Sequence, residues 1–414
     1  MPHTRRTRLP RAAWIAAAVA SASIALTSVA VAAAPVAAPP PPVVSAPSAV
    51  LVDAASGRVL FDRGGAVERP PASMAKIMTL VIAVRALAAG KVRPGDLVSV
   101  SDDAYRTGGS QIWLEPGEVL PFGQLVTAVA VGSANDAAVA IAEHLAGSVP
   151  AFVQEMNATA RRLGMTHTRF VNPNGLDAPG QTTRTTALDM ARLGAYATTL
   201  PELMRLTATR ENREIRNGKG GHLWLVNTNR LLGMLPGVDG LKTGFTSAAG
   251  YCLTATARRS GLRLIAVVMG DATSKARFAS ASSLLNWGFS HYRAAYAAHA
   301  GKALARLAVR GGKQPDVAVA AGRDVSFTVA AGERATWSRS LALPRSVDAP
   351  VGSGQAVGTL TVQSGGQAVR VPLVTMAAVE RASAIDVLKR LLRLGGHPPA
   401  AAVPTPSDTA GRAG

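Results

Sequence analysis

Residues 70–90 read PPASMAKIMTLVIAVRALAAG, a strongly apolar stretch framed by residues that break regular structure. The pair Pro70-Pro71 precedes the apolar run and Gly90 closes it, and this order is typical of the start and the end of a helix. We therefore predict a helix over Ala75 to Ala89. A serine and a lysine, Ser73 and Lys76, stand at its start in the pattern S-x-x-K.

Strand-like runs lie on both sides of this helix in the sequence. The runs 49–53 and 59–62 are joined through a turn that contains Gly57, and this pattern indicates a hairpin. We expect further strands at 251–257 and 262–269, and further helices at 124–146, 151–163, 186–196 and 275–297. Strands, then helices, then strands and a closing helix predict a mixed α/β domain over residues 47–298.

The pattern changes from residue 299 onward. Short apolar runs alternate with Gly, Ser and Pro turns up to residue 376, which predicts a small all-β domain. Residues 377–395 return to a helical pattern that is apolar on one face and basic on the other. We favour a helix that lies on an anionic membrane surface, and packing against the β domain stays the alternative. Residues 396–414 form a Pro/Ala/Ser tail, which we expect to be disordered.

The chain begins with a segment typical of targeting signals. Residues 1–34 hold four early arginines and then an almost unbroken apolar run. Small residues at 30–32 favour cleavage as a signal peptide, but an uncleaved anchor stays the alternative, because about 20 apolar residues can span a bilayer. A Pro/Ala linker follows at 35–46. Both alternatives place the functional part of the protein outside the cytoplasm.

The composition of the 414 residues excludes several classes of protein. Apolar residues make up 48%, which permits a sizeable core and excludes a disordered chain. The single cysteine, Cys252, excludes a disulfide scaffold, and the seven histidines contain no H-x-x-x-H pair, so the sequence shows no metal site. The net charge of +19 suits anionic partners. An exported chain with few aromatic residues is not expected to bind nucleic acid.

Ser73 and Lys76 could carry nucleophilic chemistry. A spacing of three places both side chains on one face of a helix, about one turn apart. A serine hydroxyl is a weak nucleophile and needs a base beside it, and a desolvated lysine can serve as that base. Backbone N–H groups at a helix start could stabilise an oxyanion. Alone, the pattern fits equally a capping serine beside a solvated lysine.

Two further short motifs strengthen the chemical interpretation. Ser133-Ala134-Asn135 offers a hydroxyl and an amide in a loop between helical stretches. Lys242-Thr243-Gly244 precedes Phe245 and a predicted strand, where a glycine would let a substrate backbone approach closely. Each motif alone is weak. Together, in the order S-x-x-K, S-x-N, K-T-G, they form the set found in penicillin-binding proteins and class A β-lactamases.

The chain resembles the low-molecular-mass penicillin-binding proteins that are serine D-alanyl-D-alanine carboxypeptidases. The resemblance covers roughly residues 47 to 297 closely, and the C-terminal architecture more loosely. It implies a mixed antiparallel sheet with helices, of the β-lactamase/transpeptidase type, followed by the small β domain and the amphipathic helix. The segments that carry it are 133–137 (SANDA), 174–180 (NGLDAPG), 238–244 (VDGLKTG), 277–278 (RF) and 284–289 (LLNWGF).

The resemblance implies a role for each site residue. Ser73 attacks the carbonyl between two terminal D-alanines of a peptidoglycan stem peptide, and Lys76 takes the serine proton. Ser133 passes a proton toward the leaving amine with Lys242 nearby, and Asn135 hydrogen-bonds a substrate amide and Lys76. No metal or organic cofactor is implied.

The resemblance also implies how the substrate is held. Backbone N–H groups of Ser73 and Phe245 form the oxyanion hole, Gly244 lines the strand beside the substrate, and Thr243 and Arg277 bind the terminal carboxylate. Implied partners are the stem peptide, β-lactam antibiotics as covalent inhibitors, and an anionic membrane surface, at the outer face of the cytoplasmic membrane.

Other functions stay open on the sequence. An endopeptidase that cuts cross-links between stem peptides is the nearest alternative. No E-x-x-L-N segment occurs between Ser133 and Lys242, which argues against an efficient class A β-lactamase. A wall-binding protein without catalytic activity is the alternative from another class.

Overall fold

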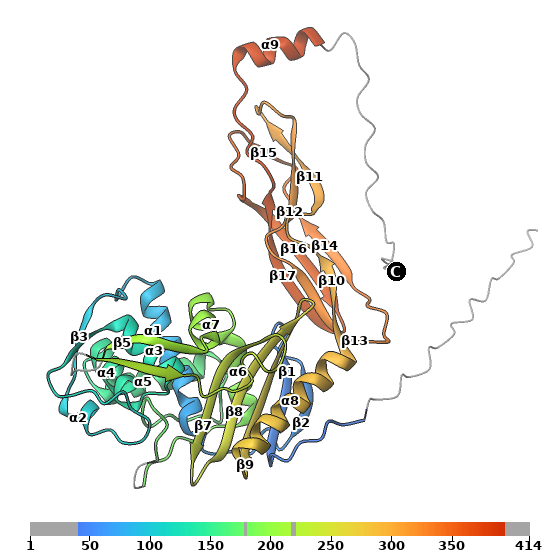
Figure 1. Ribbon diagram of the computed structural model, residues 1–414. Helices are drawn as coiled ribbons and strands as arrows, with labels where there is room; N and C mark the ends of the chain where they lie inside the picture. Colours follow the sequence, from blue (N-terminus) through green and yellow to red (C-terminus); the bar gives the residue numbers. More distant parts are fainter. Residues whose placement is uncertain (1–39, 178–179, 217–220, 394–414) are drawn as a thin grey trace, which may run out of the picture. The chain divides into compact units, whose positions relative to one another are not determined.

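The computed structural model describes residues 40–177, 180–216 and 221–393, and Figure 1 shows how their elements are arranged. The predictions for residues 1–34, for the first part of the linker (35–39) and for the tail 396–414 lie outside these residues. We refer to residues 40–291 as the α/β region and to residues 292–383 as the β region.

A five-stranded antiparallel sheet with the strand order β2-β1-β9-β8-β7 forms the centre of the α/β region. The first two strands form the predicted hairpin, and the two later predicted strands are also present. Strand β7 lies at one edge of this sheet. The five strands are β1 (Ser48–Asp53), β2 (Val59–Arg63), β7 (Val238–Thr246), β8 (Gly250–Arg259) and β9 (Leu262–Asp271).

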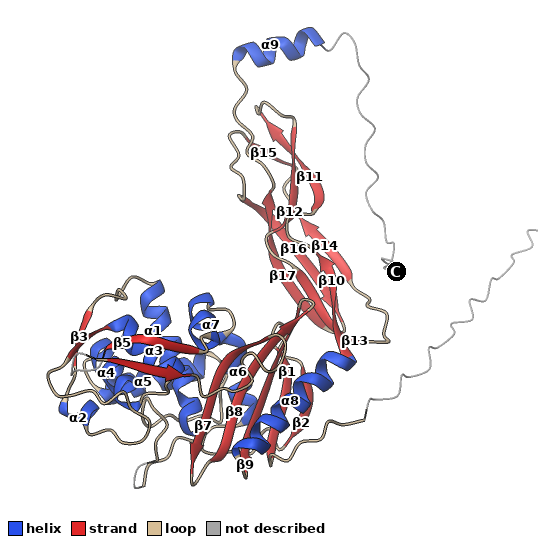
Figure 2. Ribbon diagram, in the orientation of Figure 1, coloured by secondary structure: helices blue, strands red, loops and turns tan. Residues whose placement is uncertain are grey.

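Alternate residues of the inner strands face two separate apolar cores, because successive strand residues point to opposite faces of a sheet. On β1, Val50 belongs to one core and Leu51 to the other. The first core includes helix α1 (Lys76–Ala88), and the second includes helix α8 (Ser274–His291). Figure 2 shows helices on both sides of the sheet. The mixed antiparallel α/β fold predicted from the sequence is confirmed.

Helix α1 confirms the predicted helix over Ala75 to Ala89, with one residue fewer at each end. Its residues from Lys76 to Val84 are all buried, as expected for a helix that is apolar on every side. Around it lie the remaining elements of the α/β region: α2 (Asp102–Tyr105), α3 (Phe122–Val131), α4 (Asn135–Ala146), α5 (Val149–Arg162), α6 (Ala187–Ala197), α7 (Pro201–Ala208), and the strand pairs β3 (Leu97–Ser99) with β4 (Val119–Pro121) and β5 (Glu211–Arg216) with β6 (His222–Val226).

The predicted helix at 124–146 is in fact two helices. Helix α3 ends at Val131 and α4 begins at Asn135. Between them Ser133 has φ +63, a left-handed backbone conformation that a right-handed helix cannot contain. The break therefore lies within the S-x-N motif, and it bends the chain at the residue whose hydroxyl is of chemical interest.

The predicted helix at 275–297 is wrong in its last part. Helix α8 ends at His291, and Tyr292–Ala298 forms strand β10. This strand pairs antiparallel with β13 (Val325–Ala330) of the β region. Pairing with a distant strand overrides the helix propensity of the alanines in this segment, which local sequence alone does not reveal.

The predicted terminal helix at 377–395 also begins later than expected. Helix α9 spans Ala384–Arg393, whereas Val379 and Arg381 before it form isolated β-bridges with Val351 and Gly312. Residues 377–383 therefore belong to the β region. Over the part of the chain that the structure describes, no helix is both long enough and apolar enough to cross a membrane.

The β region is all-β, as the sequence predicted, and its strands form two separate sheets. β10 pairs with β13, and a six-stranded sheet has the order β14-β16-β17-β12-β11-β15, in which only β11 and β15 are parallel. The strands are β11 (Ala303–Arg310), β12 (Asp316–Ala321), β14 (Ser338–Ala342), β15 (Ser346–Asp348), β16 (Ala356–Ser364) and β17 (Gln367–Thr375).

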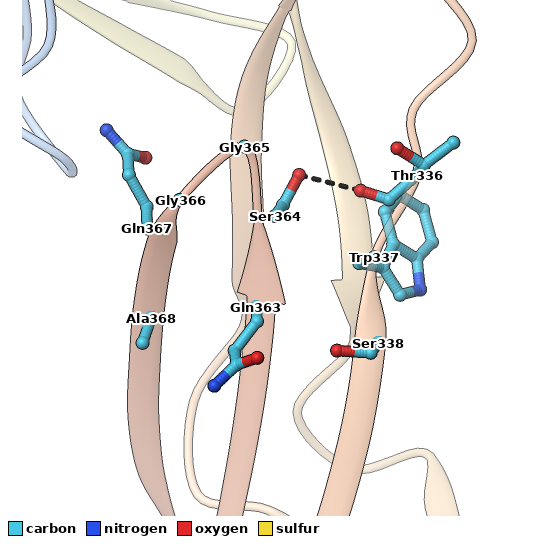
Figure 3. A pocket seen from close by; sticks show the side chains of 9 residues that line it. All are labelled: Thr336, Trp337, Ser338, Gln363, Ser364, Gly365, Gly366, Gln367 and Ala368. Carbon is cyan, nitrogen blue, oxygen red and sulfur yellow. Dashed lines mark hydrogen bonds between the residues drawn. The ribbon is translucent and has the colours of Figure 1, made fainter.

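A surface hollow lies at the tight turn between β16 and β17 and is lined by uncharged residues (Figure 3). Ser364 Oγ donates a hydrogen bond of 2.7 Å to the backbone oxygen of Thr336, which ties the turn to the segment before β14. The side chains of Gln363 and Gln367 point in different directions in Figure 3. Their amides do not converge on one ligand position, so this hollow is not the candidate site.

Candidate active site

The serine and the lysine of the S-x-x-K motif are in direct contact. Ser73 lies in a short 3-10 helix, Ala72–Ala75, immediately before α1, and Lys76 is the first residue of α1. Lys76 Nζ donates to Ser73 Oγ at 2.8 Å and to the backbone oxygen of Asn174, also at 2.8 Å. The predicted pairing of these two side chains is therefore present in the structure.

Burial changes the acid–base behaviour of Lys76. The side chain is fully buried, and this lowers its pKa well below the ordinary value for lysine. The positive charge of Lys242 lowers the pKa of Lys76 further, while the carboxylate of Asp136 raises it. A neutral amine 2.8 Å from a serine hydroxyl can accept the proton of that hydroxyl.

Two glycines permit the close packing around Ser73. A Cβ atom on Gly244 would lie 2.4 Å from the backbone oxygen of Pro71, so only glycine lets strand β7 approach the segment before the serine. Gly175 has φ +80, and a Cβ atom there would lie 2.0 Å from the backbone oxygen of Ala72. The K-T-G motif and the loop with Asn174 are thereby packed closely against the turn that contains Ser73.

Ser133 and Asn135 lie at the junction of α3 and α4, and both are buried. Asn135 Nδ2 donates to the backbone oxygen of Gly108 at 2.6 Å, and its backbone N–H donates to the backbone oxygen of Ser110 at 2.7 Å. Asn135 Oδ1 is buried and has no hydrogen-bond partner among the described residues. This acceptor is available to a donor on a bound substrate. Among the hydrogen bonds of the described residues, none joins Lys76 and Asn135.

Asp136 holds the loop at 108–114, which also accepts hydrogen bonds from Asn135. The carboxylate is fully buried and accepts backbone N–H groups from Ile112, Leu114 and Ala137. Burial raises the pKa of Asp136, and these hydrogen bonds oppose the increase. Asp136 belongs to the SANDA segment of the sequence, from which no role for it was predicted. An acidic residue that follows a motif asparagine inside an apolar helix was the available signal.

Lys242 lies on β7 and is also buried, with longer contacts than Lys76 has. Its Nζ atom is 3.4 Å from Thr228 Oγ1 and 3.4 Å from the backbone oxygen of Thr243. Burial, with a smaller effect from the positive charge of Arg277, lowers the pKa of Lys242 to about 7. The Thr243 hydroxyl makes a hydrogen bond of 2.6 Å with the hydroxyl of Thr228. Thr228 was missed by the sequence reasoning, because no local pattern marks it.

Arg277 comes from α8 and reaches the same strand. It donates from Nη1 to the backbone oxygens of Gly244 at 3.1 Å and Cys252 at 3.3 Å, and from Nη2 to Ser274 Oγ at 3.2 Å. The residue is 7% exposed, and burial lowers the pKa of its guanidinium. Phe245, by contrast, is half exposed at the end of β7. A cation, hydroxyls and an exposed ring thus lie along the edge strand beside the serine.

The arrangement suits acyl transfer through a serine. It provides a hydroxyl and, in contact with it, a lysine with a lowered pKa. A second lysine with a lowered pKa and a buried arginine that could hold an anion lie in the same site. In the ranges that the structure describes, no group of His, Cys, Asp and Glu side chains could hold a metal ion.

Two family models match this chain. The model described as D-alanyl-D-alanine carboxypeptidase matches residues 34–273, and the model described as the C-terminal domain of penicillin-binding protein 5 matches residues 294–381. Among individual proteins, D-alanyl-D-alanine carboxypeptidase DacF of Bacillus subtilis is 36% identical over 349 residues, which cover 84% of this chain and 89% of DacF. DacC of Escherichia coli is 36% identical over 351 residues, which cover 82% of this chain and 85% of DacC.

Solved structures of related proteins share the fold. Penicillin-binding protein 5 from Haemophilus influenzae has a TM-score of 0.63 and 33% identity, and the match covers 83% of this chain and 99% of that one. Penicillin-binding protein D2 from Listeria monocytogenes, solved in an ampicillin-bound form, has a TM-score of 0.55 and 32% identity. This second match covers 60% of this chain and all of the other.

Proposed function

The chain belongs to the D-alanyl-D-alanine carboxypeptidase family and is a serine hydrolase of that kind, and from this premise we propose that Ser73 is its nucleophile. The observation that carries the proposal is the 2.8 Å contact between Lys76 Nζ and Ser73 Oγ, made by a lysine that is fully buried. Burial lowers the pKa of Lys76 well below the ordinary value for lysine, and this favours the neutral amine that a general base requires.

The reaction we propose begins with acylation. Ser73 Oγ attacks the carbonyl carbon of the penultimate D-alanine while its proton moves to Lys76 Nζ. The oxyanion of the tetrahedral intermediate is held by the backbone N–H groups of Ser73 and Phe245. The peptide C–N bond then breaks, and the leaving nitrogen of the last D-alanine receives a proton through Ser133, with Lys242 nearby. Water hydrolyses the ester and restores the free serine.

In this proposal the substrate is recognised by polar groups of the site that can form hydrogen bonds or an ion pair with it. The unpartnered Oδ1 of Asn135 accepts a hydrogen bond from a substrate amide. Gly244 leaves room beside strand β7 for the substrate backbone. Thr243 and Arg277 bind the terminal carboxylate, for which a buried arginine is well suited.

We propose peptidoglycan pentapeptides as the substrate, with the stem peptide as the part that the site binds. A D,D-endopeptidase that cuts cross-links is the alternative. The reaction products on cross-linked muropeptides would separate the two, because a carboxypeptidase releases D-alanine and leaves the cross-link intact. β-Lactam antibiotics are proposed to acylate Ser73, which is supported by the ampicillin-bound structure of the Listeria monocytogenes relative.

The direct test uses a fluorescent penicillin and a pentapeptide on the full chain. We expect the wild-type protein to be labelled covalently and to release D-alanine, and we expect Ser73→Ala to lose both properties while it stays folded. Ser338→Ala, an exposed serine of the β region, is the matched control and should behave as the wild type. Release of D-alanine by Ser73→Ala at the wild-type rate would reject this nucleophile.

We further propose where the enzyme works. Residues 1–34 serve for export, and the mature protein acts in the periplasm or an equivalent extracytoplasmic space, peripheral on the outer face of the cytoplasmic membrane. Helix α9 is the proposed contact with anionic lipids, supported by the exposure of Ile385 and Leu388. Sedimentation with vesicles that contain anionic lipid should capture the mature protein, which lacks residues 1–34, and further removal of residues 384–414 should release it.

We propose a domain organisation that keeps the predicted order of domains and moves two of the predicted boundaries. The catalytic domain begins at about residue 47, and its end moves from 298 to the residue before β10, because β10 pairs with β13. The small β domain follows, and the membrane-associating segment begins with α9 at Ala384 rather than at 377; linker 35–46 precedes these parts and tail 396–414 follows them. Limited proteolysis with mass analysis of the fragments would locate the boundaries, and cleavage inside β10 would contradict a boundary before Tyr292.

A further inference from the structure

The guanidinium of Arg277 lies close to two aromatic rings. Its carbon atom is 4.6 Å from the ring centroid of Phe278 and 5.4 Å from the ring centroid of Tyr251. Both distances fall within the range of about 6 Å in which a cation is attracted to the face of an aromatic ring. Phe278 follows Arg277 on α8, whereas Tyr251 belongs to strand β8, so the two rings approach the cation from different elements.

A third ring supports Tyr251 from the side of the candidate site. Phe245 on β7 is the cross-strand partner of Tyr251 on β8, and their ring centroids are 4.3 Å apart with an interplanar angle of 30°. Phe245 is 51% exposed, while Arg277 is 7% exposed. The rings therefore run from the exposed end of β7 to the buried guanidinium.

Hydrogen bonds occupy most of the N–H donors of the Arg277 guanidinium. Its orientation therefore decides whether a remaining donor can reach a bound anion. Of its five N–H donors, three are engaged by the oxygens of Gly244, Cys252 and Ser274. Nε is buried and has no partner among the described residues. One N–H of Nη2 is left for a ligand, and a small rotation of the planar group would move this donor away from a bound anion.

We propose that Tyr251 and Phe278 are positioning residues that hold the guanidinium of Arg277 in the orientation needed to bind the terminal carboxylate of the substrate. This inference rests on the proposed role of Arg277 and adds residues to which neither the three motifs nor the family resemblance assigns a function. Tyr251 acts through its ring: its hydroxyl makes no hydrogen bond with any described residue, and the ring is in contact with both Phe245 and the cation.

The experiment measures how strongly each variant distinguishes a substrate with a terminal carboxylate from one without it. The two substrates are an N-acylated peptide that ends in D-Ala-D-Ala and the same peptide with a C-terminal amide. The readout is the ratio of kcat/KM for the carboxylate substrate to kcat/KM for the amide. A change that only loosens the fold lowers both values together, whereas a misplaced guanidinium lowers the ratio.

We expect Tyr251→Leu to lower this ratio about threefold to thirtyfold, the size of one lost cation–π contact. Tyr251→Phe keeps a ring and should retain the wild-type ratio. Phe278→Leu removes the ring on the helix side and should lower the ratio in the same direction. It also provides a second test if Tyr251→Leu folds poorly. Arg277→Ala should lower the ratio more than either ring variant does.

Phe289→Leu is the matched control. Phe289 forms an arginine–aromatic pair with Arg259, 4.4 Å from the ring centroid, at the far end of the same strand β8. It should leave the ratio unchanged. The inference would be overturned if Tyr251→Leu and Phe278→Leu both kept the wild-type ratio while Arg277→Ala lowered it. If the wild type itself showed no preference for the carboxylate, the proposed role of Arg277 would fail first, and the two failures are thus distinguishable.

Discussion

The two lysines of the site have the same side chain and nearly the same burial, yet their neighbours differ. Lys76 is 0% exposed and Lys242 is 1% exposed. Lys76 Nζ has two acceptors at 2.8 Å, one of them the hydroxyl of Ser73, whereas the hydrogen bonds of Lys242 Nζ to described residues are both 3.4 Å long. Burial lowers the pKa of both amines, so burial alone cannot assign their roles. The contact with the hydroxyl is the reason why we propose Lys76 as the base.

Arginine substitutions at the two positions should separate these roles most strongly. A guanidinium cannot lose its proton in a protein, so Lys76→Arg removes the base and should slow acylation by penicillin about 10²–10⁴-fold. Lys242→Arg keeps a positive charge on β7 and should slow the same reaction only about tenfold. Stopped-flow or time-resolved labelling with a fluorescent penicillin measures both rates.

Thermal unfolding of the two arginine variants is the control for that experiment. Both positions are buried, so both variants carry a larger side chain into a packed site. Equal slowing of acylation in the two variants, at equal stability, would mean that the difference in contacts does not separate the lysines. Lys91→Arg, at an exposed lysine, should react at the wild-type rate.

The next largest effect is expected at Asp136, whose replacement should lower the free energy of unfolding. Asp136→Ala leaves the N–H groups of Ile112 and Leu114 without their acceptor, and we expect a loss of about 2–4 kcal/mol in the free energy of unfolding. Urea unfolding measures it. Asp271→Ala is the matched control at an equally buried carboxylate, where one oxygen already lacks a partner among the described residues. A larger loss in Asp271→Ala would contradict this account.

The sequence could predict the parts of the site that depend on short spacing. Ser73 and Lys76 are three residues apart on one helical turn, and their contact follows from that spacing. The sheet with its two-faced strands was also predictable, because β8 and β9 are apolar runs of suitable length. The sequence could not place Tyr251 or Thr228 near the site, because Tyr251 contacts Arg277 on α8 and Thr228 contacts Thr243 on β7, and no local pattern predicts either contact. The strand β10 was missed for the same reason.

The charge on Lys242 should be visible in the pH dependence of acylation. Its positive charge lowers the pKa of Lys76, so Lys242→Met allows that pKa to rise. Lys76 must be neutral to act as the base, and the acidic limb of the pH–rate profile should therefore move to higher pH. Because the pKa of Lys242 itself is about 7, the difference from the wild type should grow below pH 7 and shrink above it.

The control for the pH profile is Lys275→Met, which removes an exposed lysine from the first turn of α8. Its acidic limb should coincide with that of the wild type. A shift of the limb to lower pH in Lys242→Met would contradict the electrostatic coupling between the two lysines. The amplitude at the plateau is a separate quantity, because Lys242→Met also removes a group beside the substrate.

The smallest effect concerns stability, and it also distinguishes the two lysines. The pKa of Lys242 is lowered from 10.5 to about 7 in the folded protein, so the unfolded chain binds its proton more tightly. The buried amine therefore destabilises the fold, fully at pH values below about 7 and not at all above 10.5. Lys242→Met should raise the free energy of unfolding near neutral pH by about 1–2 kcal/mol, and this gain should disappear in strongly alkaline solution.

Lys76→Met should raise the free energy of unfolding less than Lys242→Met does, although Lys76 is equally buried. The backbone oxygen of Asn174 would lose the donor that it has at 2.8 Å, and an unpaired buried acceptor costs about 1–3 kcal/mol. Lys242 has no contact as short, so its replacement leaves little unpaired. Urea unfolding of both methionine variants at neutral and alkaline pH measures the difference. An equal gain at the two positions would show that the short contacts of Lys76 contribute to catalysis alone and not to the stability of the fold.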